Sequence, residues 1–355
     1  MKKTALVLVE DEVLALKGIY ALKNSGYKVS VLTGNESVAL KYCRAVSSFC
    51  LLPTGIPDEA LLEKIRSYRA DIIFPADIDS AGRLYRLSLL DSSLPFFPCS
   101  SSEMLDALDN KNSFVSLLES HGIKCPKSIL LFPPFMESGK VAEEIGFPLV
   151  AKNLYGECGR GVDFINSREE FDRYISGQVS RDRSDSIQIQ EFISGEVFGL
   201  NICAVDGVIC AWSVYRKLDE DTISFMDRFD ICGIVSKLIS DIKYSGLANF
   251  DLIVSKDGIY FIECNPRVWY TIQADRFLGL NYIETGISNR ASPVAAEKTA
   301  KITGTYVFPK KALKMLFNPM SVWKLNYPSL RGALEVVSDP AMQLTKVLRE
   351  SLHKY

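Results

Sequence analysis

The first hundred residues alternate short apolar runs with amphipathic segments, and this alternation limits the available folds more than any other feature. The apolar runs are nearly continuous, as is typical of parallel strands that are buried on both faces. Strands that alternate with helices in this way predict a doubly wound, parallel α/β sheet. The expected strands are 4–9, 28–33, 47–53, 70–76 and 94–99, and the expected helices are 12–26, 37–45, 57–69 and 81–90.

A dinucleotide site is not expected in this first domain. The segment after the first strand, "VEDEVLALKG", has acids where the fingerprint GxGxxG would stand. Asp77 and Asp79 follow the strand 70–76, at the edge where open α/β sheets bind ligands. The favoured interpretation is simpler, because an aspartate at a strand-to-helix junction is typical of an N-cap and a second one of a turn.

From about residue 100 the pattern predicts two α+β lobes. Ser167 precedes a helical segment and Glu170 follows it by three residues, which is the spacing of a capping box. Further helices are expected at 101–122 and 138–146, and strands at 124–131, 147–154, 162–166, 186–193, 196–205, 208–217, 247–255 and 259–267. The resulting division is 1–100, 101–195, 196–300 and a C-terminal extension, 301–355, whose helices 309–316 and 339–352 are expected to pack at the surface.

Charge and hydropathy favour small-molecule partners. The formal charge is -2, from 41 basic and 43 acidic residues, and gives no electrostatic reason to expect nucleic acid or an anionic membrane as a partner. No apolar run is long enough to span a bilayer. The N-terminus "MKKTALVLVEDEV" begins like a signal peptide, but its apolar run ends at Glu10. We therefore expect a cytoplasmic protein, and a homodimer is compatible with the sequence.

Cysteine and histidine are not expected to carry the chemistry. The nine cysteines are scattered and never spaced as CxxC, which favours neither a disulfide framework nor a zinc site. The two histidines are His121, near a helix end, and His353, near the C-terminus. Nucleophilic triads and histidine-ligated metals are therefore disfavoured, and carboxylates, lysines and arginines remain.

The segment "FIECNPRVW" (261–269) places three polar residues two positions apart. In a strand, Glu263, Asn265 and Arg267 would share one face. The preceding strand and the turn "KDG" form a hairpin that would bring Asp251 near Glu263, and Asn249 beside Asn265. Carboxylate and amide oxygens suit Mg²⁺, and Arg267 could grip a phosphoryl group. The alternative is a charged outer face of the hairpin, although apolar neighbours favour a buried setting.

A glycine-bearing loop, "YGECGRGV", follows Lys152. Gly156, Gly159 and Gly161 would let backbone N–H groups approach an anion closely. The lysine precedes the glycines and no GK[ST] follows, so this is not a Walker A loop. Taken alone, the loop is equally typical of a mobile hairpin turn.

Taken in order, four motifs resemble the ATP-grasp superfamily: Lys111 in "LDNKNSF", Lys152 before "GECGRG", "IQEFISGEV", and the pair "NFDLIV" and "FIECNPR". The likeness covers about residues 1 to 290 and is greatest to carbamoyl-phosphate-synthase-like carboxylate–amine ligases. It implies an N-terminal Rossmann-like domain, a doubly wound parallel sheet, followed by the two-lobed α+β ATP-grasp fold. The lobes would be a small one with the glycine loop and a large one with the metal site.

The resemblance also implies roles for individual residues. The nucleotide phosphates would meet Lys111 and Lys152, with the glycine loop as a lid. Adenine would meet the hinge at Gln190, Glu191 and Ile193, and ribose would meet Glu196, which could instead be a surface strand residue. The metal ligands would be Asp251, Glu263 and Asn265, with Arg267 at the reacting phosphoryl group.

An ADP-forming ligase is the implied activity. A carboxylate would attack the γ-phosphoryl group of ATP, with Mg²⁺ or Mn²⁺ bound, and an amine would capture the acylphosphate. Arg216, Lys217 and Arg228, in "WSVYRKLDEDTISFMDRFD", are candidates to hold the substrate carboxylate, although each is individually more typical of a solvated loop. Two alternatives stay open: a bicarbonate-activating carboxylase or carbamoyl-phosphate-type enzyme, and a non-catalytic ATP-binding regulatory module.

Overall fold

The computed structural model describes residues 3–10, 12–34, 38–155, 161–181, 184–295, 302–318 and 320–339. The chain divides into two compact units. The large unit contains Met1–Leu105, Gly199–Asn249 and Asn265–Tyr355, and the small unit contains Asp106–Phe198 and Phe250–Cys264. Each unit is built from segments that are distant in the sequence.

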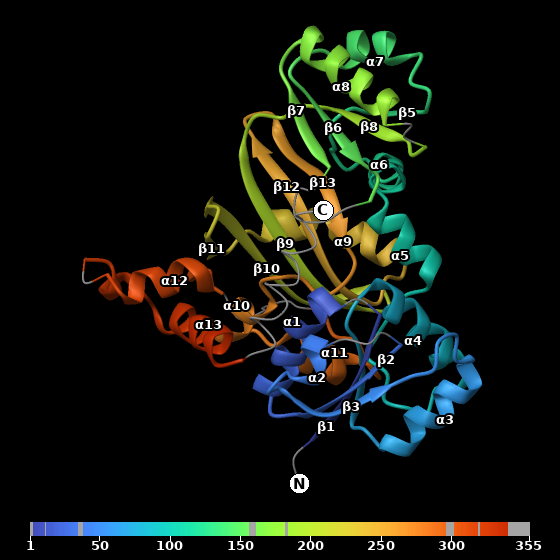
Figure 1. The fold of residues 1–355 in the computed structure, drawn as a ribbon, viewed down its shortest axis with the longest axis vertical. Helices are drawn as coiled ribbons and strands as arrows, with labels where there is room; N and C mark the ends of the chain where they lie inside the picture. Colours follow the sequence, from blue (N-terminus) through green and yellow to red (C-terminus); the bar gives the residue numbers. More distant parts are fainter. Residues whose placement is uncertain are drawn as a thin grey trace. The chain divides into compact units, whose positions relative to one another are not determined.

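The predicted parallel sheet forms the N-terminal part of the large unit (Figure 1). Its strand order is β3-β2-β1-β4, and all three pairings are parallel. This order confirms the doubly wound α/β prediction. The elements are β1 (Thr4–Val9), α1 (Glu12–Asn24), β2 (Lys28–Thr33), α2 (Val38–Lys41), β3 (Val46–Leu51), α3 (Asp58–Tyr68), β4 (Ile72–Pro75) and α4 (Ile78–Leu90).

Two predictions in this region are wrong. The fifth strand, 94–99, is reduced to a single parallel bridge between Ile73 and Phe96. Pro95 and Pro98 flank that bridge, and proline has no N–H to continue a strand ladder. The helix expected over 37–45 is the four-residue α2. It ends before Cys43, whose N–H bonds back to Leu40 O in a tight turn.

A capped break divides the helix expected over 101–122. The structure has α5 (Ser102–Asp109) and α6 (Lys111–Ser120). Asn110 caps α6, because its side chain accepts from the N–H groups of Asn112 and Ser113. The break places Lys111 in the first turn of α6.

The small unit contains a four-stranded sheet in the order β5-β8-β6-β7, with antiparallel pairings. Helices α7 and α8 cover one face and enclose an apolar core that includes Phe171 and Ile189 (Figure 1). Ser167 caps α8 by accepting from Glu170 N–H, as the capping-box spacing predicts. The elements are β5 (Ser128–Leu131), α7 (Ser138–Ile145), β6 (Leu149–Asn153), β7 (Val162–Ile165), α8 (Arg168–Ser180) and β8 (Ile187–Glu191).

A six-stranded sheet has the order β13-β12-β9-β10-β11-β14. Its first hairpin turns at Asp206 and Gly207, which both have positive φ, as a two-residue hairpin turn requires. The elements are β9 (Glu196–Val205), β10 (Val208–Asp219), β11 (Thr222–Met226), α9 (Phe229–Asp241), β12 (Gly246–Ser255), β13 (Gly258–Asn265), α10 (Ile272–Phe277), α11 (Tyr282–Asn289) and β14 (Gly304–Val307).

The core of the large unit joins the N-terminal sheet to later segments. Val7 and Phe74 of the parallel sheet belong to the same buried cluster as Tyr215, Trp269 and Tyr282. The N-terminal sheet and helices α10 and α11 therefore share one apolar core. This shared core fixes the segment after β13 relative to the N-terminal sheet.

The C-terminal part of the described chain contains α12 (Pro309–Leu316), the 3-10 helix η1 (Val322–Lys324) and α13 (Tyr327–Ser338). Helix α12 confirms the predicted 309–316. The sequence reasoning missed α13, although Asn326 caps it. The helix predicted for 339–352 lies outside the described residues, except for Asp339. Within the described ranges, no helix is long and apolar enough to cross a membrane.

Candidate active site

Two lysines lie buried in the small unit beside carboxylates. Lys111 comes from the first turn of α6 and Lys152 from β6, and their exposed fractions are 4% and 5%. The Lys111 Nζ atom lies 3.6 Å from Glu263 Oε1. The Lys152 Nζ atom donates to Gln190 Oε1 at 2.6 Å. The structure thus brings together four residues that the sequence singled out.

Burial and neighbouring charges shift the pKa values of this group. The pKa of Lys152 falls to about 8, chiefly because burial disfavours the ammonium ion; Lys111 lowers it further, while Glu263 and Asp251 oppose the shift. Burial raises the pKa of Glu263, against the attraction of the two lysines. We call Lys111, Lys152, Asp251 and Glu263 the lysine–carboxylate cluster, because each affects the charge of another member.

Polar side chains of β8 border this cluster. Gln190 Nε2 donates to Ser128 Oγ at 2.8 Å, which leaves Gln190 Oε1 turned to Lys152. Gln188 Nε2 donates to Lys111 O at 3.1 Å, and Gln188 Oε1 is buried with no hydrogen-bond partner among the described residues. Sequence reasoning missed Gln188. The two-residue spacing from Gln190 in "IQIQEF" would have placed it on the same strand face.

The predicted hinge and glycine loop flank the same sheet. Glu191 ends β8, where its N–H donates to Lys127 O at 2.8 Å, and Ile193 follows half-buried. Glu196 begins β9 and is exposed. Gly161 has φ +68°, and a Cβ there would lie 2.2 Å from Asn153 Nδ2, so the loop end requires glycine. Gly156 and Gly159 lie outside the described residues.

The other predicted residues of the FIECNPRVW segment belong to the large unit. Asn265 ends β13, and its Oδ1 accepts from the Arg267 guanidinium at 2.8 Å. Asn265 Nδ2 donates to Asn249 Oδ1 at 3.5 Å, as the hairpin interpretation predicts. Asn265 and Asn249 are both buried, which favours the buried interpretation over a charged outer face.

A fully buried carboxylate, Asp275, lies behind these amides. Asn249 Nδ2 donates to Asn201 Oδ1 at 2.9 Å, and Asn201 Nδ2 donates to Asp275 Oδ2 at 3.2 Å. Trp269 Nε1 and Ser213 Oγ also donate to Asp275. Sequence reasoning missed Asp275 and Asn201, because their partners lie in other elements and no local spacing links them.

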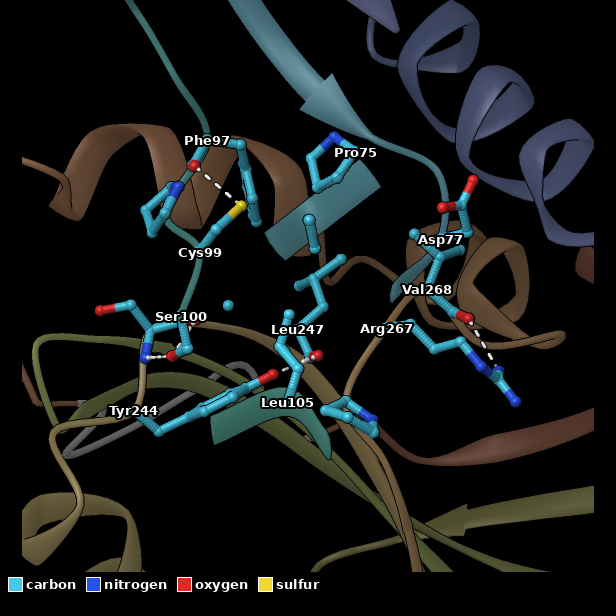
Figure 2. A pocket seen from close by; sticks show the side chains of 15 residues that line it. Pro75, Asp77, Phe97, Cys99, Ser100, Leu105, Tyr244, Leu247, Arg267 and Val268 are labelled. Atoms are coloured by element: carbon cyan, nitrogen blue, oxygen red, sulfur yellow. Dashed lines mark hydrogen bonds between the residues drawn. The ribbon is translucent and has the colours of Figure 1, made fainter. Parts of the chain in front are cut away.

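A small pocket in the large unit includes Arg267 in its wall (Figure 2). It encloses about 300 Å³, open solvent included, and Pro75, Phe97, Cys99 and Leu247 make it largely apolar. Arg267 donates to Val268 O at 3.3 Å in this view.

Asp77 also lines this pocket at the end of β4, where ligands bind in open sheets. Its side chain accepts from Ser80 N–H and Glu10 N–H, both at 2.8 Å. Asp77 is therefore the N-cap that the simpler interpretation predicted, and Asp79 lies in the first turn of α4.

The three candidate substrate cations lie on or beside the β10–β11 hairpin. The expectation of a solvated loop is wrong for Arg216 and Lys217, which belong to β10, because the segment pairs in register with β11. Lys217 is exposed and Arg216 is half-buried. Arg228 precedes α9 and binds Asp230 at 2.7 Å. All three cations belong to the large unit.

No cluster of three or more His, Cys, Asp or Glu side chains suited to a metal occurs in the described part of the chain. The predicted ligand set has two carboxylates and one amide. Such a set suits Mg²⁺ only when substrate phosphates complete its oxygen shell.

Part of this chain matches a known protein family. Residues 108–271 match the family model described as the ATP-grasp domain. This match over residues 108–271 confirms the resemblance inferred from the motifs.

Particular relatives are distant. The chain is 23% identical over 287 residues to the carbamoyl phosphate synthase large chain of Thermotoga neapolitana, a match that covers 74% of this chain and 25% of that protein. It thus spans about a quarter of the length of the curated relatives it matches.

Solved structures share the fold at low sequence identity. N5-carboxyaminoimidazole synthetase from Staphylococcus aureus, complexed with ADP, has a TM-score of 0.69 at 16% identity, over 91% of this chain and 87% of that one. L-amino acid ligase from Bacillus licheniformis has a TM-score of 0.58 at 18% identity, over 84% and 77%. Both likenesses confirm the α/β plus ATP-grasp architecture.

Proposed function

We propose that this protein is an ADP-forming carboxylate–amine ligase that joins small molecules through an acylphosphate intermediate. The observation that supports it most directly is the lysine–carboxylate cluster, with its two buried lysines, within the residues that match the ATP-grasp family model. Two buried ammonium groups could contact the phosphates of a polyanion, and two acids could ligate a dication bound to it, so that each charge would have a partner of opposite sign. The ADP-bound synthetase of similar fold supports a nucleotide as that polyanion.

The residues present fit ATP and Mg²⁺. Lys111 and Lys152 would contact the phosphates, and the depressed pKa of Lys152 would rise again beside an anion. Gln188 Oε1, a buried acceptor without a partner, could accept from a donor on the nucleotide. Main-chain groups of Glu191 and Ile193 would meet adenine.

Further residues would contact the nucleotide or its metal. Glu196 would meet ribose, and Gln190 would keep Lys152 in place through their hydrogen bond. The metal would be held by Asp251, Glu263 and Asn265. When bound, the metal would neutralise charge on the terminal phosphates.

The chain's own groups would position the reacting phosphoryl group and keep water out. Arg267 would hold that group as a planar donor, since a guanidinium presents paired N–H groups to phosphate oxygens. The glycine loop that ends at Gly161 would close over the phosphates. No covalent protein nucleophile is required, because positioning and charge neutralisation are sufficient for phosphoryl transfer.

The carboxylate substrate would be held by cations of the large unit. Arg216 and Lys217 on β10 are candidates to hold the acid, and Arg228 is a weaker one because Asp230 already binds it. We also propose that the protein acts in the cytoplasm and that it forms homodimers. The proposed domain boundaries lie at about residues 100, 195 and 300. Bicarbonate activation is the second candidate, favoured by the carbamoyl phosphate synthase relative.

The test is a mass-spectrometric assay of Mg-ATP incubations with pooled carboxylates and amines. We expect ADP together with a product that has lost one water. Glu263→Gln should lower turnover at least about 100-fold, because Glu263 is both a proposed metal ligand and the partner of Lys111, and the substitution removes its charge. Glu63→Gln, at an exposed position in α3, is the matched control.

The outcomes separate the candidates. AMP in place of ADP would contradict the acylphosphate route. ADP release that depends on bicarbonate would favour the carboxylase alternative. Unchanged turnover in the Glu263 variant would sink the metal assignment, and nucleotide binding without any turnover would favour a regulatory module.

A further inference from the structure

Five polar side chains in the large unit form a hydrogen-bond chain with a single direction. The Arg267 guanidinium donates to Asn265 Oδ1 at 2.8 Å, and Asn265 Nδ2 donates to Asn249 Oδ1 at 3.5 Å. Asn249 Nδ2 then donates to Asn201 Oδ1 at 2.9 Å, and Asn201 Nδ2 donates to Asp275 at 3.2 Å. We call these five residues the amide relay. Every oxygen in it points toward Arg267, and every amide nitrogen points toward Asp275.

The chemistry of the two ends sets this direction. A guanidinium has only donors, so the Asn265 atom that it contacts must be the oxygen. A carboxylate oxygen accepts, so the Asn201 atom that faces Asp275 must be the nitrogen. Trp269 Nε1, which can only donate, contacts the same carboxylate at 3.2 Å and keeps its oxygen as an acceptor. The direction therefore follows from the partners at both ends.

The relay is enclosed in the large unit. Asp275 and Asn201 have no exposed surface, and Asn249 and Asn265 are 5% and 9% exposed. Ser213 donates to Asp275 as well and accepts from the buried Tyr282 hydroxyl at 2.8 Å. A buried carboxylate with several donors costs less than an unpaired one, but an apolar residue would avoid that cost. The cost suggests a role other than stability.

We propose that Asp275 is a positioning residue, which acts through two intervening amides to hold the oxygen of Asn265 toward the bound metal. This inference rests on the proposed ligase function. If Arg267 turns to a phosphoryl group, the Asn265 oxygen loses the guanidinium donor that fixes it. The hydrogen bonds that lead from Asn265 to Asp275 then hold the orientation of the Asn265 amide alone.

Replacement of Asp275 by asparagine tests this role with little change in shape. Trp269 Nε1 and Asn201 Nδ2 contact the same oxygen of Asp275, so the asparagine would keep its acceptor oxygen there but would lose the negative charge that orders these donors. Asn265 would then be held by a weaker, neutral relay, and its oxygen would be turned to the metal less firmly. Asp275→Asn should therefore weaken metal binding about 10-fold, since loss of the groups that hold a metal ligand typically costs 10–100-fold.

A swapped pair provides the rescue. In the double variant Asn201→Asp with Asp275→Asn, residue 201 is a carboxylate that offers only acceptors, so Asn249 donates to a charged partner. A negative charge again holds the direction of Asn249 and Asn265, with the net charge unchanged. We expect metal affinity within about 2-fold of the unchanged protein.

Asp339→Asn is the matched control for stability. Asp339 is also a fully buried aspartate of the large unit, and it accepts from the Tyr20 hydroxyl and from Arg44 N–H. Tyr20 and Arg44 are not members of the amide relay. This variant should lower the unfolding midpoint without changing metal affinity.

The measurement is the dissociation constant of Mn²⁺ from the complex of the full chain with ADP, determined by electron paramagnetic resonance. Weakened binding in Asp275→Asn, recovered in the swapped pair and absent in Asp339→Asn, is the expected result. Equal affinities in the two single variants would overturn the proposal, and so would a swapped pair no tighter than Asp275→Asn.

The failure of this inference can be told from the failure of the proposed function. If the unchanged protein binds Mn²⁺ with ADP and Glu263→Gln does not, the ligase site stands whatever Asp275 does. If the unchanged protein binds no Mn²⁺ with ADP, both proposals are overturned.

Discussion

Asp275 links protonation to folding at the scale of a single residue. Burial raises its pKa to about 7, against hydrogen bonds from Ser213, Trp269 and Asn201, which favour the charged form. Tyr282, the titratable neighbour, has a pKa raised well above 10 by burial and stays neutral in this range. The folded protein therefore binds the Asp275 proton more tightly than the unfolded chain does.

This difference predicts a pH-dependent stability. The contribution of Asp275 is fully present below its unfolded pKa of about 4 and is lost as the pH rises through about 7. The loss is about 4 kcal/mol, since each pKa unit corresponds to about 1.4 kcal/mol. Urea denaturation should show the free energy of unfolding falling more steeply from pH 4 to pH 8 in the unchanged protein than in Asp275→Asn. Parallel curves would contradict the assigned pKa.

Helix α6 shows how one element positions a functional group. Asn110 satisfies two N–H groups at its start and so fixes the turn that contains Lys111. Asn110→Ala should cost about 1 kcal/mol of stability, as loss of an N-cap typically does. It should also weaken ADP binding, measured by calorimetry, because the first helical turn, which contains Lys111, is no longer held by the cap.

The cap of α8 is the control for this prediction. Ser167 accepts from Glu170 N–H in the same small unit, and the helix that it caps contains no member of the lysine–carboxylate cluster. Ser167→Ala should lower stability by a similar amount and leave ADP affinity unchanged. If the two cap variants bound ADP equally well, the cap would have no role in placing Lys111.

Local patterns explain which elements the sequence could predict. Strands β1 and β2 match the expected 4–9 and 28–33, because a short apolar run is itself the signal of a buried strand. The break at Asn110 was missed, although Asp-Asn-Lys offers a capping residue inside a helical pattern. The strand predicted at 94–99 did not form, because Pro95 and Pro98 limit the ladder although the two phenylalanines favour a strand.

Some residues of the candidate site could be predicted from local sequence patterns and others could not. Glu263, Asn265 and Arg267 lie two residues apart, so strand periodicity alone could group them. Asp275 contacts Asn201, which is 74 positions away, and Ser213, which is 62 away. No local period can reveal such contacts, since only tertiary packing brings these elements together. The relay was therefore visible only in the folded chain.

At the scale of the whole molecule, the proposed ligands are divided between two compact units. Asp251 and Glu263 belong to the small unit, whereas Asn265 and Arg267 belong to the large unit. The chain passes from one unit to the other between Cys264 and Asn265, within a single strand. The proposal that a nucleotide with its metal contacts all four residues therefore predicts coupled stability of the two units.

This coupling gives a prediction for the entire chain. At a concentration of Mg-ADP 100 times its dissociation constant, the folded state should gain about 2.7 kcal/mol, because the ligand binds only that state. Hydrogen exchange should slow in β6 and β8 of the small unit and also around the amide relay of the large unit. Glu263→Gln should lose the protection in both units together, since the metal is the proposed link. Protection confined to the small unit would mean that the nucleotide contacts that unit alone, and Asn265 and Arg267 would then have no part in its binding.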